Sequence, residues 1–71
     1  MEYSRKFENR TFYIEKNYDY KEHKTIYQIW RYDPNACAIY RACTWPFCDC
    51  PNFDSFIQAV KYLKENITEM V

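Results

Sequence analysis

The 71-residue chain contains no glycine. Phosphate-binding loops, dinucleotide-binding turns and the nucleophile elbow of hydrolases place the backbone where a side chain would clash, so they depend on glycine. None of these motifs can therefore be present here in its usual form. This absence argues against the commonest nucleotide-binding and nucleophilic enzymes.

Hydrophobic runs are also missing from the sequence. No apolar stretch approaches the roughly 20 residues that span a bilayer. The first residues, Met1-Glu2-Tyr3-Ser4-Arg5-Lys6, are polar and charged rather than an apolar export signal. We therefore expect a cytoplasmic protein without a membrane partner, in which cysteines would stay reduced.

The chain lacks an excess of charge of either sign. Ten basic residues balance ten acidic ones, which leaves a formal net charge of zero. General nucleic-acid binders carry a basic excess, because contacts with phosphates dominate their affinity. The charge balance thus disfavours nucleic acid as the partner.

Aromatic residues are abundant, at 21% of the chain, and eight of them are tyrosines. Tyr and Trp offer a large contact area with few rotatable bonds to immobilise. The composition therefore favours a small binding module in a single domain over residues 1–71. So short a chain often needs a metal, a disulfide or a second subunit for stability, and the sequence leaves all three open.

Three segments have the alternation or composition of β-strands: residues 10–17, 25–32 and 36–45. In the first, Phe12 and Ile14 alternate with Tyr13 and Glu15. The second and third are rich in β-branched and aromatic residues, and turn-forming residues 33–35 join them as a hairpin. Charged residues 18–24 indicate a loop, and residues 3–8 could add a short fourth strand.

A helix is expected after an irregular, proline-containing connection over residues 46–51. Ser55 and Gln58 have the spacing of a capping box, in which each side chain satisfies a free backbone N–H. Apolar residues then recur every three or four positions, which places them on one side of a helix: Phe56, Ala59, Val60, Leu63 and Ile67. The predicted fold is α+β, a three-stranded antiparallel sheet, or four-stranded with residues 3–8, with one C-terminal amphipathic helix packed on one face.

Both faces of the predicted sheet are apolar. In the second strand, Tyr27 and Ile29 alternate with Ile26, Trp30 and Tyr32. One helix covers one face, so the other face would be an exposed aromatic surface of the kind that binds a protein partner. Alternatively, the N-terminal arm crosses that face, or a second copy of the chain buries it in a homodimer.

The sequence does not decide which face the helix covers. The candidate partner-binding residues therefore come from both faces and follow the Trp, Tyr and Arg bias of interface hot spots. They are Tyr13, Tyr27, Trp30, Arg31, Tyr32, Tyr40 and Arg41.

The four cysteines have a C-x5-C-x4-C-x-C spacing, unlike the paired spacing of zinc ribbons. Cys37 and Cys43, on one face of a strand, would lie about 20 Å apart and could not share an ion. A zinc site would have to use Cys43, Cys48 and Cys50, with His23 as the fourth ligand. The alternative, small core residues and free thiols, fits the spacing better, so no cofactor is expected.

Nucleophilic catalysis by cysteine requires a base beside the thiolate. His23 is the only histidine, and it would have to meet Cys48 or Cys50. Nothing in the sequence places them together, and no glycine shapes an oxyanion turn. We therefore expect a protein that is not an enzyme.

A single-stranded nucleic-acid-binding sheet is a further alternative, because basic and aromatic residues are interleaved. The basic residues are Lys16, Lys21, Lys24, Arg31 and Arg41, and the aromatic ones include Tyr13, Tyr27 and Tyr40. Such basic residues can also simply protect strand edges. The zero net charge favours the second interpretation.

Residues 53–64 have a phrase of the form F-x-S-hydrophobic-x-x-A-hydrophobic-x-hydrophobic-hydrophobic, which includes Ser55, Ala59 and Leu63. This segment resembles the closing helix of small phage and prophage accessory proteins. These proteins share the β-β-β-α order, and anti-CRISPR inhibitors are among them. The resemblance implies a cofactor-free inhibitor or regulator that occludes a host protein in the bacterial cytoplasm. The element order is also similar to the DNA-binding domain of tyrosine integrases, but that family's sheet is basic and contains glycine.

Overall fold

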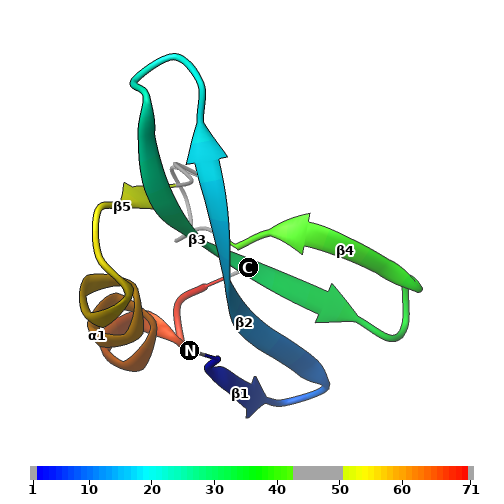
Figure 1. Cartoon of the computed structure of the whole chain (residues 1–71). Coiled ribbons are helices and arrows are strands. Elements are labelled where there is room, and N and C mark those ends of the chain that lie inside the picture. The colour runs from blue at the N-terminus through cyan, green and yellow to red at the C-terminus, as the bar shows by residue number, and fades with distance from the viewer. Residues whose placement is uncertain (1, 43–50, 71) are drawn as a thin grey trace.

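The structure is a computed structural model, and it describes residues 2–42 and 51–70. Within these residues it contains five strands and one helix (Figure 1): β1 (Ser4–Phe7), β2 (Arg10–Asp19), β3 (Lys24–Asp33), β4 (Ala38–Arg41), β5 (Asn52–Phe53) and α1 (Phe56–Asn66). Every strand pair is antiparallel. The α+β class, with one C-terminal helix on an antiparallel sheet, is confirmed, and so is the short strand expected within residues 3–8.

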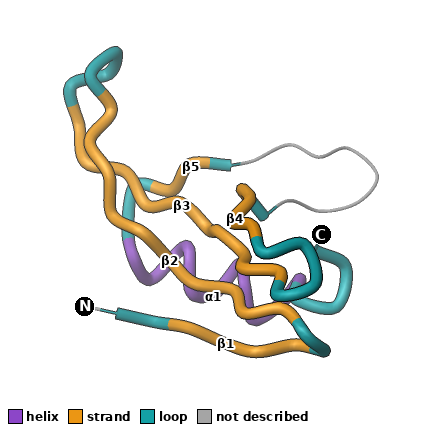
Figure 2. The backbone as a smooth tube through the Cα atoms, turned by 90° about the vertical axis from the view of Figure 1, so that its right-hand side faces the viewer, coloured by secondary structure: helices purple, strands orange, loops and turns teal. Residues whose placement is uncertain are grey.

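The strands follow the order β1-β2-β3-β4, and β5 pairs with β3. β2 and β3 pair from Thr11↔Tyr32 to Asp19↔Lys24, whereas β4 and β5 pair with different parts of β3. The end of the β2–β3 hairpin therefore projects beyond the other strands, as Figures 1 and 2 show. We call this projection, residues 15–26, the hairpin arm.

The turn of the hairpin arm is shorter than the sequence suggested. Both strands continue into the segment 18–24, which was expected to be a loop, and leave only residues 20–23 between them. The carboxylate of Asp19 accepts hydrogen bonds from the backbone N–H groups of Lys21 (2.9 Å) and Glu22 (3.3 Å). An Asp side chain that bonds to the backbone ahead of it closes a turn without glycine.

Three residues adopt the left-handed backbone conformation in which glycine is favoured. They are Glu8, His23 and Cys37, with φ of 57°, 54° and 50°. Cys37 therefore belongs to the turn before β4, and its expected place on a strand is wrong. The third strand is correspondingly shorter than residues 36–45, since it begins at Ala38.

The helix begins as the capping pattern predicts. The Ser55 hydroxyl accepts a hydrogen bond from the backbone N–H of Gln58 at 3.2 Å. α1 packs on β2, β3 and β5, and among the described residues it does not contact β4. This helix is 11 residues long, and no helix in the described part of the chain is long and apolar enough to span a membrane.

The core lies between α1 and one face of the sheet. Its buried members are Phe12, Ile29, Ala42, Leu63, Ile67 and Met70. The last two follow the helix, and Arg10 donates a hydrogen bond from Nη1 to the carbonyl oxygen of Met70 at 3.2 Å. This contact ties the residues after α1 to the start of β2.

Candidate functional site

The strand register assigns every residue to one of two sheet faces, since residues directly opposite each other in an antiparallel pair share a face. Phe12, Ile14 and Ile29 lie on the face that α1 covers. Two rows lie on the other face, which we call the open face. They are Tyr13–Trp30–Arg41 and Thr11–Tyr32–Ile39.

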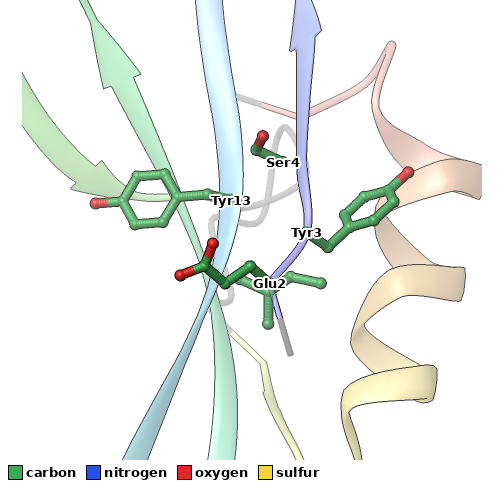
Figure 3. Close-up of a pocket in the computed structure, with 5 residues that line it drawn as sticks. Glu2, Tyr3, Ser4 and Tyr13 are labelled. Carbon is green, nitrogen blue, oxygen red and sulfur yellow. The ribbon is translucent and has the colours of Figure 1, made fainter.

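Four of the seven predicted binding residues, Tyr13, Trp30, Tyr32 and Arg41, thus gather on the open face. Figure 3 shows Tyr13 pointing away from the helix. Tyr32 is 41% exposed, and its neighbour Ile39 is 56% exposed. These two exposed residues share one row and lie beside the half-buried Tyr13 and Trp30 of the next row. Together they form an aromatic and apolar patch of the kind typical of an interaction surface.

The other three predicted residues lie on the helix side. The Tyr27 ring packs edge-on against Phe56, with 6.0 Å between ring centroids. The Arg31 guanidinium lies 5.0 Å from the centroid of the Tyr40 ring. Tyr40 is nevertheless 44% exposed, because α1 does not reach β4. The seven residues therefore do not form one surface.

A chain of side-chain hydrogen bonds crosses the open face from β2 to β4. Asn17 donates to Gln28 (2.8 Å), and Gln28 donates to the Oδ1 atom of Asn52 (3.1 Å). Arg41 donates from Nη2 to the same Oδ1 atom (3.0 Å) and to the carbonyl oxygen of Pro51 (3.3 Å). This polar chain links β2 to β3, β3 to β5 and β5 to β4.

Sequence reasoning missed this polar chain. Its only signal was the position of Asn17 and Gln28, which alternation places on the same face as Tyr13 and Trp30. The partner Asn52 lies in a two-residue strand that has no detectable period. At the end of the polar chain, the Arg41 guanidinium is bonded to Asn52 and to the carbonyl of Pro51.

The Arg41 guanidinium also contacts the indole of Trp30, since its Cζ atom lies 5.6 Å from the ring centroid in a cation–π contact. Burial, and after it the negative charge of Glu15, raises the pKa of the neighbouring Tyr13. The Trp30 Nε1 atom is buried and finds no hydrogen-bond partner within the described residues. The centre of the open face is thus an aromatic and polar cluster in which Trp30 and Asn52 both contact the Arg41 guanidinium.

A pocket of about 450 Å³ lies beside the open face, where β1 begins. Its lining residues are Glu2, Tyr3, Ser4, Tyr13 and Ile14. In Figure 3, Tyr3 points toward α1 and Tyr13 points to the opposite side, so the pocket lies at the sheet edge between the two faces. We call it the edge pocket.

The cysteine hypotheses stay predictions. Cys43, Cys48 and Cys50 lie outside the described residues, and His23 is exposed at the tip of the hairpin arm. Across residues 2–42 and 51–70, no three His, Cys, Asp or Glu side chains gather as a metal site would require.

The basic residues do not gather on one aromatic surface. Lys16 and Arg31 lie on the helix side, whereas Arg41 lies on the open face. Lys24 forms an ion pair with Asp54, with 2.8 Å between Nζ and Oδ1, and this hydrogen bond raises the pKa of Lys24. A strand of nucleic acid would therefore meet few of these cations at once.

Comparison with known proteins gave no match: no protein-family model, curated protein or solved structure is significantly similar to the chain. The phage-like resemblance of residues 53–64 stays a prediction. The open face and the edge pocket are the features of this fold from which function can be inferred.

Proposed function

We propose that the protein is a non-catalytic binding module that holds another protein on its open face. The observation that carries the proposal is the row Tyr13–Trp30–Arg41, which lies beside exposed Tyr32 and Ile39 on the face opposite α1. Tyr, Trp and Arg are the residues that dominate binding energy at protein interfaces.

The fixed position of Arg41 supports this proposal. Its guanidinium is held by Trp30 and by the Oδ1 atom of Asn52. A long side chain that is ordered before binding loses little conformational entropy on binding, which favours affinity. The open face therefore offers a preformed centre with an apolar margin at Ile39.

A protein fits this surface better than a single-stranded nucleic acid. Stacked bases need cations beside the aromatic rings to neutralise phosphates, and the predicted basic residues are divided between the two faces. The amides of Asn17 and Gln28 can instead bond with polar groups of a protein surface.

Inhibition of a host protein would follow from such binding by occlusion alone. A stoichiometric partner that covers a surface excludes every other ligand from it, and no catalytic group is needed. This role, which the phage-like resemblance implies, is part of the proposal and requires that the partner lose an activity when the complex forms.

The proposal predicts that substitutions on the open face weaken binding of a partner protein. Tyr32→Ala and Ile39→Ser change exposed side chains, so both variants should keep the fold. Tyr20→Ala, at a residue that is 80% exposed in the hairpin arm, is the matched control. A partner captured by cross-linking would be purified, and its affinity for each variant measured by titration calorimetry.

We expect a stoichiometry of one to one and a loss of about tenfold or more in affinity for Tyr32→Ala, equivalent to about 1.4 kcal/mol. Tyr20→Ala should bind like the unchanged chain. Equal affinities for Tyr32→Ala, Ile39→Ser and the unchanged chain would show that the partner does not use the open face.

A further inference from the structure

The outer edge of β2 is only partly paired. β1 covers this edge from Arg10 to Tyr13, and one more bond runs from the Ile14 N–H to the Tyr3 carbonyl at 3.2 Å. In the described part of the chain, no strand pairs with the outer edge from Glu15 to Asp19. An exposed strand edge is a template for another strand.

The bond from the Ile14 N–H to the Tyr3 carbonyl shows which backbone groups of β2 point away from β3. Backbone groups of alternate strand residues point to the same side of the strand. Because the Ile14 N–H points outward, those of Lys16 and Tyr18 point outward as well. The backbone N–H and C=O groups of Glu15 and Asn17 point to β3 instead. The backbone groups at the free edge therefore belong to other residues than those that bond β2 to β3.

The edge pocket lies where the free edge begins, between the start of β1 and Tyr13 (Figure 3). It offers the Tyr13 ring and the carboxylate of Glu2, whereas the Tyr3 ring points toward α1, where Lys64 Nζ lies 5.7 Å from its centroid. Glu15 adds a second negative charge on the same side of the strand as Tyr13, near enough to act on its hydroxyl. Aromatic rings together with carboxylates bind a Lys or Arg side chain through cation–π contacts and ion pairs.

We propose that an extended segment of a partner protein adds to the outer edge of β2 as a further strand, with a Lys or Arg side chain in the edge pocket. Backbone bonds to Lys16 and Tyr18 supply affinity, and the pocket supplies the preference for a basic side chain. The added strand also covers part of Tyr18, which is 47% exposed.

This strand-addition site shares Tyr13 with the open face and otherwise uses different groups. The open face uses side chains of β2, β3 and β4, whereas the added strand uses the backbone of β2 from Lys16 to Tyr18 and residues at the start of β1. A substitution such as Tyr32→Ala, which tests the open face, should leave strand addition unchanged. The two proposals can therefore fail separately.

The test begins with a display library of random 10-residue peptides selected on the full chain. Selected peptides are synthesised with a fluorophore, and their affinities are measured by anisotropy. Lys16→Pro removes one outward N–H, and proline is tolerated at an edge strand whose N–H faces outward. Lys16→Ala, which keeps the N–H, is the matched control.

We expect the selected peptides to share a Lys or Arg at one position. Their affinity should fall about tenfold or more with Lys16→Pro, stay within about threefold with Lys16→Ala, and fall with Glu2→Gln for the basic peptides. If Lys16→Pro fails to fold, a chemically synthesised chain with N-methylated Tyr18 removes the other outward N–H and should give the same loss.

Three results would overturn the proposal. One is that no peptide is enriched, or that the enriched peptides lack a basic residue. Another is equal binding to the unchanged chain and to a folded chain with a blocked N–H. The third is a dimer in sedimentation that Lys16→Pro dissociates, because a second copy of the chain would then occupy the edge.

Discussion

At the scale of single residues, Tyr13 combines a place in the open face with a place in the edge pocket. Burial, followed by the negative charge of Glu15, raises its pKa above the ordinary value of 10.0. The unfolded chain therefore releases this proton at a lower pH than the folded chain. The contribution of Tyr13 to stability is complete below about pH 10 and is lost as the pH rises through the folded pKa.

Tyr13→Phe removes this group, so we expect a flatter decline in the free energy of unfolding above about pH 10. Urea unfolding of both chains at a series of alkaline pH values checks the difference. Tyr20→Phe is the control, since Tyr20 is 80% exposed. Parallel curves for Tyr13→Phe and the unchanged chain would contradict the assigned environment of Tyr13.

Residue identity also explains where sequence reasoning stopped. The alternation of residues in β3 correctly predicted that Tyr27 and Trp30 lie on opposite faces of the sheet. It could not decide which of them faces the helix, because the residues on both sides are apolar or aromatic. The decision comes from packing, in which Ile29 and Phe12 fit against Leu63. Cys37 was misplaced because a left-handed turn residue without glycine has no sequence signal.

At the scale of elements, the start of α1 was predictable because capping is local chemistry. Ser55 accepts from the Gln58 backbone N–H, and α1 has no acidic residue in its first turn. We expect Ser55→Ala to lower the free energy of unfolding by about 1 kcal/mol. Urea unfolding followed by far-ultraviolet circular dichroism measures this change.

Ser55→Asp is the matched control for the cap. It keeps an oxygen acceptor and places a negative charge near the positive end of the helix dipole, so stability should equal or exceed that of the unchanged chain. A loss as large as that of Ser55→Ala would mean that the hydroxyl acts through a contact other than the cap.

Elements without local signals were not predictable. β5 has two residues, and its pairing of Tyr27 with Phe53 bridges distant parts of the sequence. Too few residues show alternation there for a strand to be recognised. The polar chain depends on Asn52 in this strand. The sequence therefore could not reveal the hydrogen bonds that Asn52 accepts from Gln28 and Arg41.

At the scale of the whole molecule, the two sheet faces differ in composition. The helix side contains the core, and the open face combines aromatic residues with a polar chain. A 71-residue chain has a small core, which typically supplies about 3–5 kcal/mol of stability. We therefore expect core residues that follow the helix to contribute as much to the free energy of unfolding as core residues within the helix.

Ile67 and Met70 close the core after the helix ends, and they are 6% and 1% exposed. Truncating one buried aliphatic side chain to alanine costs about 2–5 kcal/mol. We expect Met70→Ala to lose stability in this range. A chain that ends at Asn66 loses both side chains and the carbonyl that Arg10 bonds, and should be unfolded at room temperature.

The dispersion of amide signals in NMR spectra measures this prediction directly. Glu69→Ala, at an exposed position in the same turn, keeps the backbone bond from Glu69 to Asn66 and should retain a native spectrum. Native dispersion in the chain that ends at Asn66 would show that α1 and the sheet suffice as a core. Collapse of the spectrum would show that this small fold is completed by residues that lie beyond its last regular element.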